Sequence, residues 1–300
     1  MFAIRSPLMA LMLLAACDGN PFPGGPVTGG GGGGGTPDPL LVPAVEKQNM
    51  NAAIYTPGDP TIQVNMTSQD ATALSATYTR NPAFDVGGYQ AYSYQESSSN
   101  RYVLALVKQT GSVKGLIAVE GGQFANYHGG GDFVRADLFT MGSGVAGKAN
   151  YSGSYVGMMN IGTPVPGPGG DLNPTRSYRT QGRALITADF TEMKVSGGVD
   201  GRQIVDPMVD ASGNVDPTLD PTLDTISLFE TGITSSGTFA GTVNKGTTVV
   251  GDYAGLFAGL NSAQVAALLV FTPYSGSSDI KEHGLIVLDN CVDAGGPACP

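Results

Sequence analysis

The cysteine at position 17 stands in a context that predicts covalent attachment of lipid. Met1 and Arg5 give a positively charged start, an apolar run extends from Leu8 to Ala16, and small residues precede Cys17. Such a run is too short to span a bilayer and is typical of a secretory signal that a peptidase removes. We therefore expect residues 1–16 to be a bacterial lipoprotein signal peptide and Cys17 to be the lipidated first residue of the mature chain.

Two further cysteines, Cys291 and Cys299, lie at the C-terminal end, with Gly-Gly-Pro between them. An exported chain occupies a compartment that permits disulfides, and this short stretch can turn tightly enough to bring the sulfurs together. We expect the two cysteines to pair. No metal site is predicted, because two thiols do not complete a tetrahedral ligand set and neither histidine is close in sequence.

The chain offers little for nucleophilic catalysis. An imidazole base could come only from His128 or His283, and the sequence has no Gly-x-Ser-x-Gly motif. We interpret His128, which precedes three glycines, as an exposed loop residue, and His283 as an edge residue before the last strand. The sequence thus predicts a protein that is not an enzyme.

A glycine-rich segment from Gly142 to Ala149 comes near the pattern of a phosphate-binding loop, in which glycine amides and a lysine hold phosphate and a hydroxyl holds magnesium. Ala149 stands in place of the hydroxyl residue, and a Tyr/Gly strand pattern follows instead of a helix. We interpret the segment as an interdomain linker and expect no cofactor.

Acidic residues gather between Gln203 and Asp224, where the tetrapeptide Asp-Pro-Thr-Leu occurs twice. The aspartates are Asp206, Asp210, Asp216, Asp220 and Asp224. Such carboxylates could bind calcium, but the stretch from Asp210 to Asp216 lacks the spacing of the helix–loop–helix calcium site. We interpret the segment as a solvated loop, with calcium binding as the open alternative.

The composition narrows the range of partners. The formal net charge is -10, 45 residues are glycine and only 13% are charged. Negative charge repels nucleic acid and anionic lipid headgroups, so we expect no nucleic-acid partner and a membrane attachment that depends on the lipid at Cys17. Low charge with many Ser, Thr, Asn and Gly residues favours an exported all-β protein.

Residues 17–45 form a Gly/Pro-rich segment that can bury little surface. We interpret it as a tether that holds the folded part about 30 Å from the lipid surface. Residues 46–146 show β-like runs separated by turn residues. The expected strands are Leu74–Thr79, Tyr89–Tyr94, Arg101–Val107 and Val113–Val119, with hairpin connections at Ser97–Asn100 and Thr110–Ser112. These features predict an antiparallel meander.

From Gly147 onward, eight segments rich in β-branched and aromatic residues predict a closed antiparallel barrel. They are Lys148–Met158, Arg183–Thr191, Lys194–Asp200, Thr225–Gly232, Thr238–Val243, Val249–Phe257, Gln264–Phe271 and Gly284–Leu288. The intervening stretches Ile161–Gly182 and Gln203–Asp224 are expected to be loops. Tyr151, Gly153, Tyr155 and Gly157 share one face, so we expect these aromatic rings to cover backbone that glycines leave bare.

Several segments of this half follow one another in an order that a known protein family shares. They are Ala149–Gly157, in which glycines alternate with aromatics, the hairpin Ala184–Gly197, the stretch Ser236–Thr242 and the Gly/aromatic strand, turn and strand of Gly251–Ala267. In this order they resemble the β-barrel of transferrin-binding protein B and related Gram-negative surface lipoproteins. Leu260 stands where that family usually has proline, Gln264 where it has glutamate, and Ala266 and Ala267 where glycines are common.

The resemblance covers about Gly147 to Asp289 and implies an all-β fold with a β-rich handle (residues 46–146) before an eight-stranded barrel (residues 147–300). It also implies a membrane-anchored module that captures a protein or other ligand through the handle face and barrel loops. A small barrel is nearly filled by side chains, which favours function on loops and rims. The alternative is a structural envelope lipoprotein with no soluble ligand. We favour the outer-membrane surface, although Asp18 allows the periplasmic face of the inner membrane.

Overall fold

The computed structural model describes residues 43–67, 73–95, 102–120, 129–137, 139, 147–161, 165–167, 170–172, 177–209, 214–273 and 280–291. The chain divides into a unit spanning Met1–Gly34 and a unit spanning Gly35–Pro300, and every described residue belongs to the second. The predicted signal peptide, Cys17 and most of the tether therefore lie outside the described residues. No described helix is long and apolar enough to cross a membrane.

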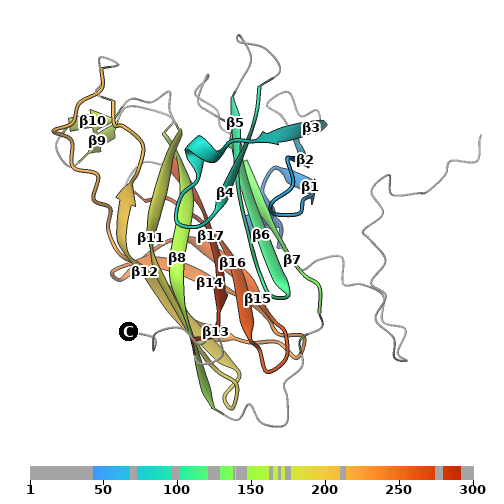
Figure 1. Cartoon of the computed structure of the whole chain (residues 1–300). Helices are drawn as coiled ribbons and strands as arrows, with labels where there is room; N and C mark the ends of the chain where they lie inside the picture. Colours follow the sequence, from blue (N-terminus) through green and yellow to red (C-terminus); the bar gives the residue numbers. More distant parts are fainter. Residues whose placement is uncertain are drawn as a thin grey trace, which may run out of the picture. The chain divides into compact units, whose positions relative to one another are not determined.

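The second unit is an all-β structure, as predicted (Figure 1). Its first half, which we call the handle, is a seven-stranded antiparallel sheet whose strands follow one another in chain order. The strands are β1 (Met50–Ile54), β2 (Thr61–Thr67), β3 (Ala73–Arg80), β4 (Gln90–Tyr94), β5 (Val103–Thr110), β6 (Val113–Glu120) and β7 (Gly129–Arg135). A single helical turn, α1 (Ala44–Lys47), precedes β1, and a 3-10 turn, η1 (Pro82–Phe84), joins β3 to β4. The predicted meander is confirmed.

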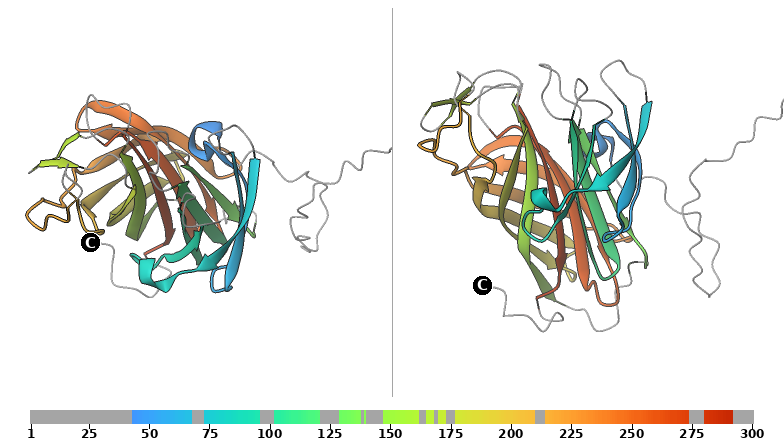
Figure 2. Two further views of the ribbon diagram at one scale, coloured as in Figure 1. Left: turned by 90° about the horizontal axis from the view of Figure 1, so that it is seen from above. Right: turned by 45° about the horizontal axis from the view of Figure 1, so that its top comes forward.

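The second half is the predicted closed antiparallel barrel, in the order β11-β12-β13-β14-β15-β16-β17-β8. The strands are β8 (Lys148–Ile161), β11 (Ser177–Asp189), β12 (Lys194–Ile204), β13 (Ile226–Gly232), β14 (Thr238–Lys245), β15 (Thr248–Ala258), β16 (Gln264–Phe271) and β17 (Ile280–Asp289). All eight predicted strands are present, most of them longer than predicted. Figure 2 shows the barrel ring from above, with the handle sheet on one side of it.

The prediction that Ile161–Gly182 is a loop is wrong in part. A short hairpin, β9 (Val165–Gly167) with β10 (Gly170–Leu172), occupies its middle, and β11 already begins at Ser177. The stretch from Ser177 to Gly182 pairs with the last residues of β8. This part of β11 was not predicted because its residues are mostly polar. Its pairing depends on the long partner strand β8 and not on a pattern of apolar side chains.

The barrel interior is filled by side chains. Tyr151, Tyr155, Tyr253 and Phe257 point inward and are fully buried, as the alternation of aromatics predicts. Glycines make room for them: a β-carbon on Gly284 would lie 2.5 Å from the Tyr155 ring. The rings thus pack against bare backbone, which confirms their structural role.

The handle and the barrel share one hydrophobic core. The handle contributes Val86, Tyr89, Ala91, Leu106, Val113, Ile117, Val119 and Phe133, and the barrel contributes Val156, Met158, Leu256, Ala258, Ala266, Leu268, Leu285 and Val287. Contact is close enough that a β-carbon on Gly115 of β6 would lie 2.5 Å from Leu285 of β17. Each fully buried aliphatic side chain contributes about 2 kcal/mol, so this interface stabilises both halves.

The opposite face of the handle sheet has a core of its own. Tyr92, Val107 and Leu116 lie in it, together with Ile62 and Val64 of β2. Strands β5 and β6 are therefore buried on both faces, which explains why Val113–Val119 reads as a nearly continuous apolar run instead of an alternating one.

Candidate binding surface at the junction of handle and barrel

Four side chains from distant parts of the sequence meet where the handle adjoins one end of the barrel. We call Phe84, Tyr102, Arg179 and Asp206 the junction cluster. The Arg179 guanidinium lies 4.8 Å from the centre of the Phe84 ring, and the Phe84 and Tyr102 rings are 6.0 Å apart. Arg179 Nε donates to Asp206 Oδ1 at 3.0 Å, and its backbone N–H donates to Asp206 Oδ2 at 2.6 Å. The cluster therefore joins handle, barrel wall and the acidic insert.

Each member is placed by a different element. Phe84 ends η1, where Pro82 favours the start of the 3-10 turn. Arg179 lies on the outward face of β11, because its neighbours Tyr178 and Thr180 are buried. Asp206 follows the end of β12, and the N–H of Val205 donates to the Arg179 carbonyl at 3.0 Å.

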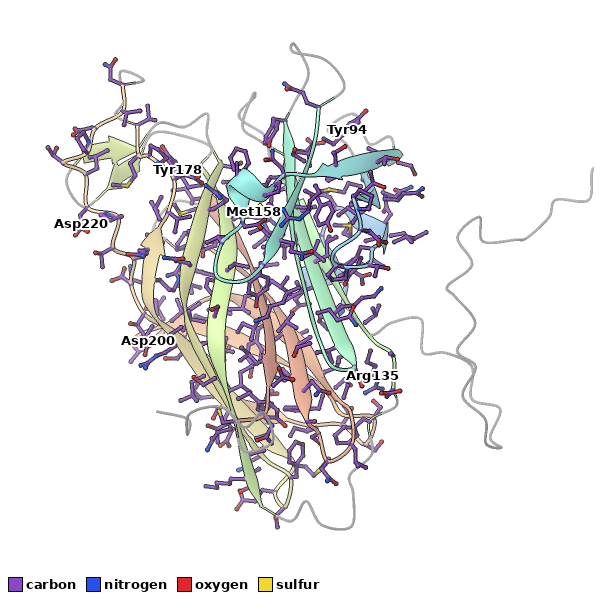
Figure 3. All side chains as sticks on the ribbon, viewed as in Figure 1. Tyr94, Arg135, Met158, Tyr178, Asp200 and Asp220 are labelled. Carbon is purple, nitrogen blue, oxygen red and sulfur yellow. The ribbon has the colours of Figure 1, made fainter. Side chains whose placement is uncertain are left out.

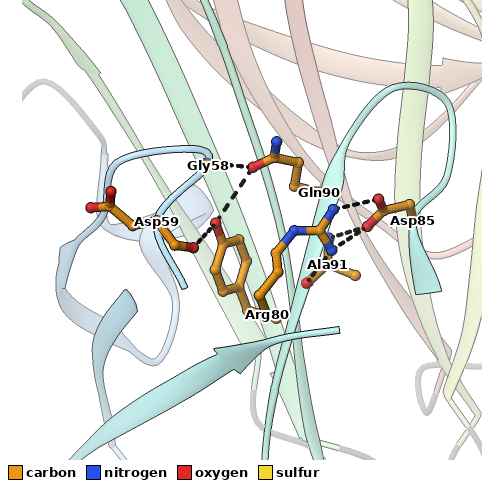
Figure 4. A network of polar contacts seen from close by, with 7 residues as sticks. Gly58, Asp59, Arg80, Asp85, Gln90 and Ala91 are labelled. Carbon is orange, nitrogen blue, oxygen red and sulfur yellow. Dashed lines mark hydrogen bonds and ion pairs between the residues drawn. The ribbon is translucent and has the colours of Figure 1, made fainter. Parts of the chain in front are cut away.

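A polar network holds η1 against the handle (Figure 4). Arg80 pairs with Asp85 through two hydrogen bonds, of 2.7 and 2.5 Å. Arg80 also donates to the Ala91 carbonyl at 3.0 Å, and the Ala91 N–H donates to Asp85 Oδ1 at 2.8 Å. Burial alone would raise the pKa of Asp85, but hydrogen bonds from Arg80 and Ala91 and the charges of Arg80 and Arg179 lower it. Asp85 is therefore held as a carboxylate.

The same network reaches the turn between β1 and β2. Tyr92 Oη donates to the Asp59 carbonyl at 2.9 Å, and the Gly58 N–H donates to Gln90 Oε1 at 2.7 Å. These contacts tie the turn between β1 and β2 to β4 beside η1.

The acidic insert packs some of its side chains against one end of the barrel instead of lying wholly free in solvent. Leu219 and Leu223, the last residues of the two Asp-Pro-Thr-Leu copies, are buried against Met159, Tyr178 and other residues of the barrel end. Figure 3 shows Asp220 in the insert and Tyr178 near the barrel end. The prediction of a solvated loop is thus wrong for these leucines. It was based on the repeated aspartates, and the leucines between them were not considered.

The aspartates of the insert have local partners. Asp216 Oδ1 accepts from the Thr218 N–H at 2.9 Å, and Asp220 Oδ1 accepts from the Thr222 N–H at 2.8 Å. Hydrogen bonds from the threonine side chains, together with these backbone bonds, lower the pKa of both carboxyls. Asp224 pairs with Lys245, and Asp210 lies outside the described residues. Within the described part of the chain, no group of three or more His, Cys, Asp or Glu residues could hold a metal ion.

An ion pair inside the barrel was not predicted. Arg202 of β12 pairs with Glu282 of β17, and their side chains are 1% and 0% exposed. Tyr155 Oη and Thr180 Oγ1 each donate to Glu282 Oε1 at 2.7 Å. A signal was present in the sequence, since Glu282 shares the inward alternation of Gly284 and Ile286. Because its hydrogen-bonding capacity is used by these neighbours, we assign the pair to the structure of the barrel.

The prediction for His283 is wrong. It lies within β17, which starts at Ile280, and it is 4% exposed because the handle covers that outer face of the barrel. A β-carbon on Gly129 would lie 2.7 Å from its ring. Burial lowers the pKa of His283 to about 4, and neither ring nitrogen has a partner among the described residues. His128 lies outside the described residues.

The remaining predicted positions are only partly covered. Cys291 is disulfide-bonded, but Cys17 and Cys299 both lie outside the described residues, so the pairing with Cys299 stays a prediction. Of the glycine-rich segment Gly142–Ala149, the structure describes residues from Gly147, and β8 begins directly at Lys148.

Comparison with known proteins finds similarity to solved structures alone. No protein-family profile matches the chain, and no curated protein sequence matches it. Among solved structures, it is similar to a double mutant of the vaccine antigen transferrin-binding protein B from Haemophilus parasuis Hp5, with 8% identity, a TM-score of 0.41 and coverage of 79% of this chain and 52% of that one.

Two further structures show the same likeness. HpuA from Kingella denitrificans, solved in complex with human haemoglobin, has 12% identity and a TM-score of 0.37, with 85% of this chain and 91% of that one covered. Isotype 1 transferrin-binding protein B from serogroup B Neisseria meningitidis has 13% identity and a TM-score of 0.35, with 80% and 52% covered. The chain thus spans about half the length of the transferrin-binding protein B chains that it matches. The predicted resemblance to transferrin-binding protein B-like proteins is confirmed by these matches.

Proposed function

We propose that this protein is a lipid-anchored bacterial envelope lipoprotein without catalytic activity that binds a protein ligand through the junction cluster and the adjoining handle face and barrel loops. The observation that carries the proposal is the cluster itself. Phe84, Tyr102 and Arg179 are residue types that are enriched at protein interfaces. The Arg80–Asp85 network holds the turn that carries Phe84, and Asp206 holds Arg179.

The filled barrel supports a ligand on the outer surface. Aromatic side chains occupy its interior, and Leu219 and Leu223 of the insert pack against the end that lies beside the cluster. Pro82 and Ala83 next to Phe84 are exposed, so a partner can approach η1 directly.

Anchoring depends on the proposed lipid at Cys17, with residues 17–45 as the tether. Metabolic labelling of cells with radioactive palmitate should mark the wild-type protein and leave a Cys17→Ala variant unmarked. Protease treatment of intact cells then distinguishes the favoured outer-membrane surface, where the folded part is cut, from the periplasmic face of the inner membrane that Asp18 allows, where it is protected. Equal labelling of both proteins would end the lipoprotein proposal.

Ligand capture tests the binding surface. The mature protein in detergent micelles is used as bait with host fluids and spent growth medium, and bound proteins are identified by mass spectrometry. Phe84→Ala should abolish capture of any specific ligand. Arg183→Ala, which removes an exposed pair with Asp200 on the barrel wall, should leave capture unchanged.

Two outcomes would count against this function. A ligand that both variants retain would bind elsewhere on the protein. The absence of any specifically captured protein would favour the alternative, a structural envelope lipoprotein with no soluble ligand.

A further inference from the structure

The seam that closes the barrel, between β17 and β8, is interrupted. The two strands pair from Ile280 with Ile161 as far as Ile286 with Tyr155. They meet again at an isolated bridge between Asn290 and Tyr151, which keeps the same register. Between these points the described strands form no ladder pairs.

The hydroxyl of a handle residue occupies this interruption. Tyr89 Oη accepts a hydrogen bond from the Val287 N–H at 2.9 Å. It lies 3.0 Å from the Ser154 carbonyl and 3.3 Å from the Leu285 carbonyl, to which its proton can be donated. Tyr89 therefore bonds both β17 and β8 at the point where their ladder stops, and it is fully buried there.

The turn before Tyr89 is built for close approach to the seam. Gly87 and Gly88 have φ angles of +58° and +81°, which favour glycine at both central positions of a tight turn. A β-carbon on Gly87 would lie 3.2 Å from Val156 and 3.3 Å from the Ser154 β-carbon. On the handle side, Lys108 Nζ lies 4.9 Å from the centre of the Tyr89 ring. The ring is thus fixed from both sides.

The same short connection carries both the seam residue and the binding surface. It runs from β3 to β4 and contains Phe84 of the junction cluster, Asp85 of the polar network and, four residues later, Tyr89. We propose that Tyr89 is a latch through which the handle closes the barrel seam, so that movement of η1 at the junction cluster changes the closure of the barrel. The coupling to ligand rests on the proposed function, but the latch does not.

Hydrogen exchange of the Val287 amide, followed by NMR on the mature protein without ligand, tests the latch. Tyr89→Phe keeps the ring and removes the hydroxyl, so the Val287 amide should exchange about tenfold faster. Tyr253→Phe is the matched control. Tyr253 Oη donates to the Phe229 carbonyl elsewhere in the barrel, so this variant should leave the exchange rate of the Val287 amide unchanged. Unchanged or slower exchange in Tyr89→Phe would show that protection of the Val287 amide does not depend on the Tyr89 hydroxyl, and would overturn the latch.

Phe84→Ala tests the coupling without touching the seam. Releasing η1 from Arg179 should speed exchange at Val287, by a smaller factor than Tyr89→Phe. If Val287 exchanges at the wild-type rate in this variant, movement of η1 does not reach the seam and the coupling is wrong. Because no ligand is present in either measurement, these outcomes are independent of whether a ligand is captured.

Discussion

Gln264 joins the two halves of the protein through a side chain that both donates and accepts. Its Nε2 donates to Asp289 at 3.3 Å, and its Oε1 accepts from the Ser112 N–H in the handle at 3.4 Å. The glutamate that is usual in the resembled family would place a carboxylate beside Asp289. We predict that Gln264→Glu lowers the free energy of unfolding by about 1 kcal/mol at pH 7.

Urea denaturation checks this prediction. The loss should shrink at low pH, where protonation of the introduced carboxyl removes the repulsion. Gln63→Glu, at an exposed position of β2, is the control and should change stability by less than about 0.5 kcal/mol. Equal effects at the two positions would show that Gln264 has no special role at the interface.

Two buried titratable groups give the stability of the protein opposing pH dependences. Burial raises the pKa of Glu46 from 4.5 to about 7, so its contribution to stability is complete below pH 4.5 and is lost as pH rises through 7. Burial lowers the pKa of His283 from 6.5 to about 4, so its contribution is complete above pH 6.5 and is lost as pH falls towards 4.

We therefore predict opposite pH profiles for two variants. The stability of Glu46→Gln relative to wild type should increase between pH 4.5 and 7, by up to about 3 kcal/mol. The stability of His283→Leu relative to wild type should instead increase as pH falls from 6.5 to 4. Denaturation midpoints measured at half-unit pH steps give both profiles. Parallel profiles would contradict the opposite signs.

At the scale of elements, each copy of the duplicated Asp-Pro-Thr-Leu packs its leucine against the end of the barrel. Leu219 and Leu223 are 6% and 8% exposed at the barrel end. We predict that Leu219→Ala or Leu223→Ala lowers the free energy of unfolding by about 2–4 kcal/mol. Val215→Ala in the same insert, 61% exposed, should cost less than about 0.5 kcal/mol. Urea titration of the three variants distinguishes an insert that stabilises the fold from a loop that contributes nothing to the free energy of unfolding.

Most strands could be predicted from the sequence, because the residue pattern of a strand is local. Contacts between surface side chains could not, because they join residues that are distant in the sequence. Alternating Tyr and Gly revealed β8 and β15, and the two-residue turn at Gly111 and Ser112 revealed the β5–β6 hairpin. The junction cluster could not be predicted, since Phe84 and Tyr102 meet Arg179 and Asp206 only through the docking of the handle on the barrel. His283 was misplaced for the same reason: the surface that buries it comes from β7.

For the whole molecule, the shared core predicts one unfolding transition. Amides of Leu116 in the handle and Val265 in the barrel should lose protection from hydrogen exchange at the same urea concentration. Gly131→Ala, whose β-carbon would lie 2.4 Å from Leu268, should lower both midpoints together. A handle that opens at a lower concentration than the barrel would show that the halves are thermodynamically separate.

The two-faced burial of β5 and β6 has a practical consequence for experiments. A fragment that ends after β7 would leave Ile117 and Val119 bare on the side from which β16 and β17 were removed, and a fragment that starts at β8 would leave Leu268 and Leu285 equally bare. Both fragments would expose an apolar surface that associates nonspecifically with other proteins, and this association would be mistaken for ligand binding. Ligand contacts on this protein are therefore better mapped by point substitutions in the intact chain than by dissection.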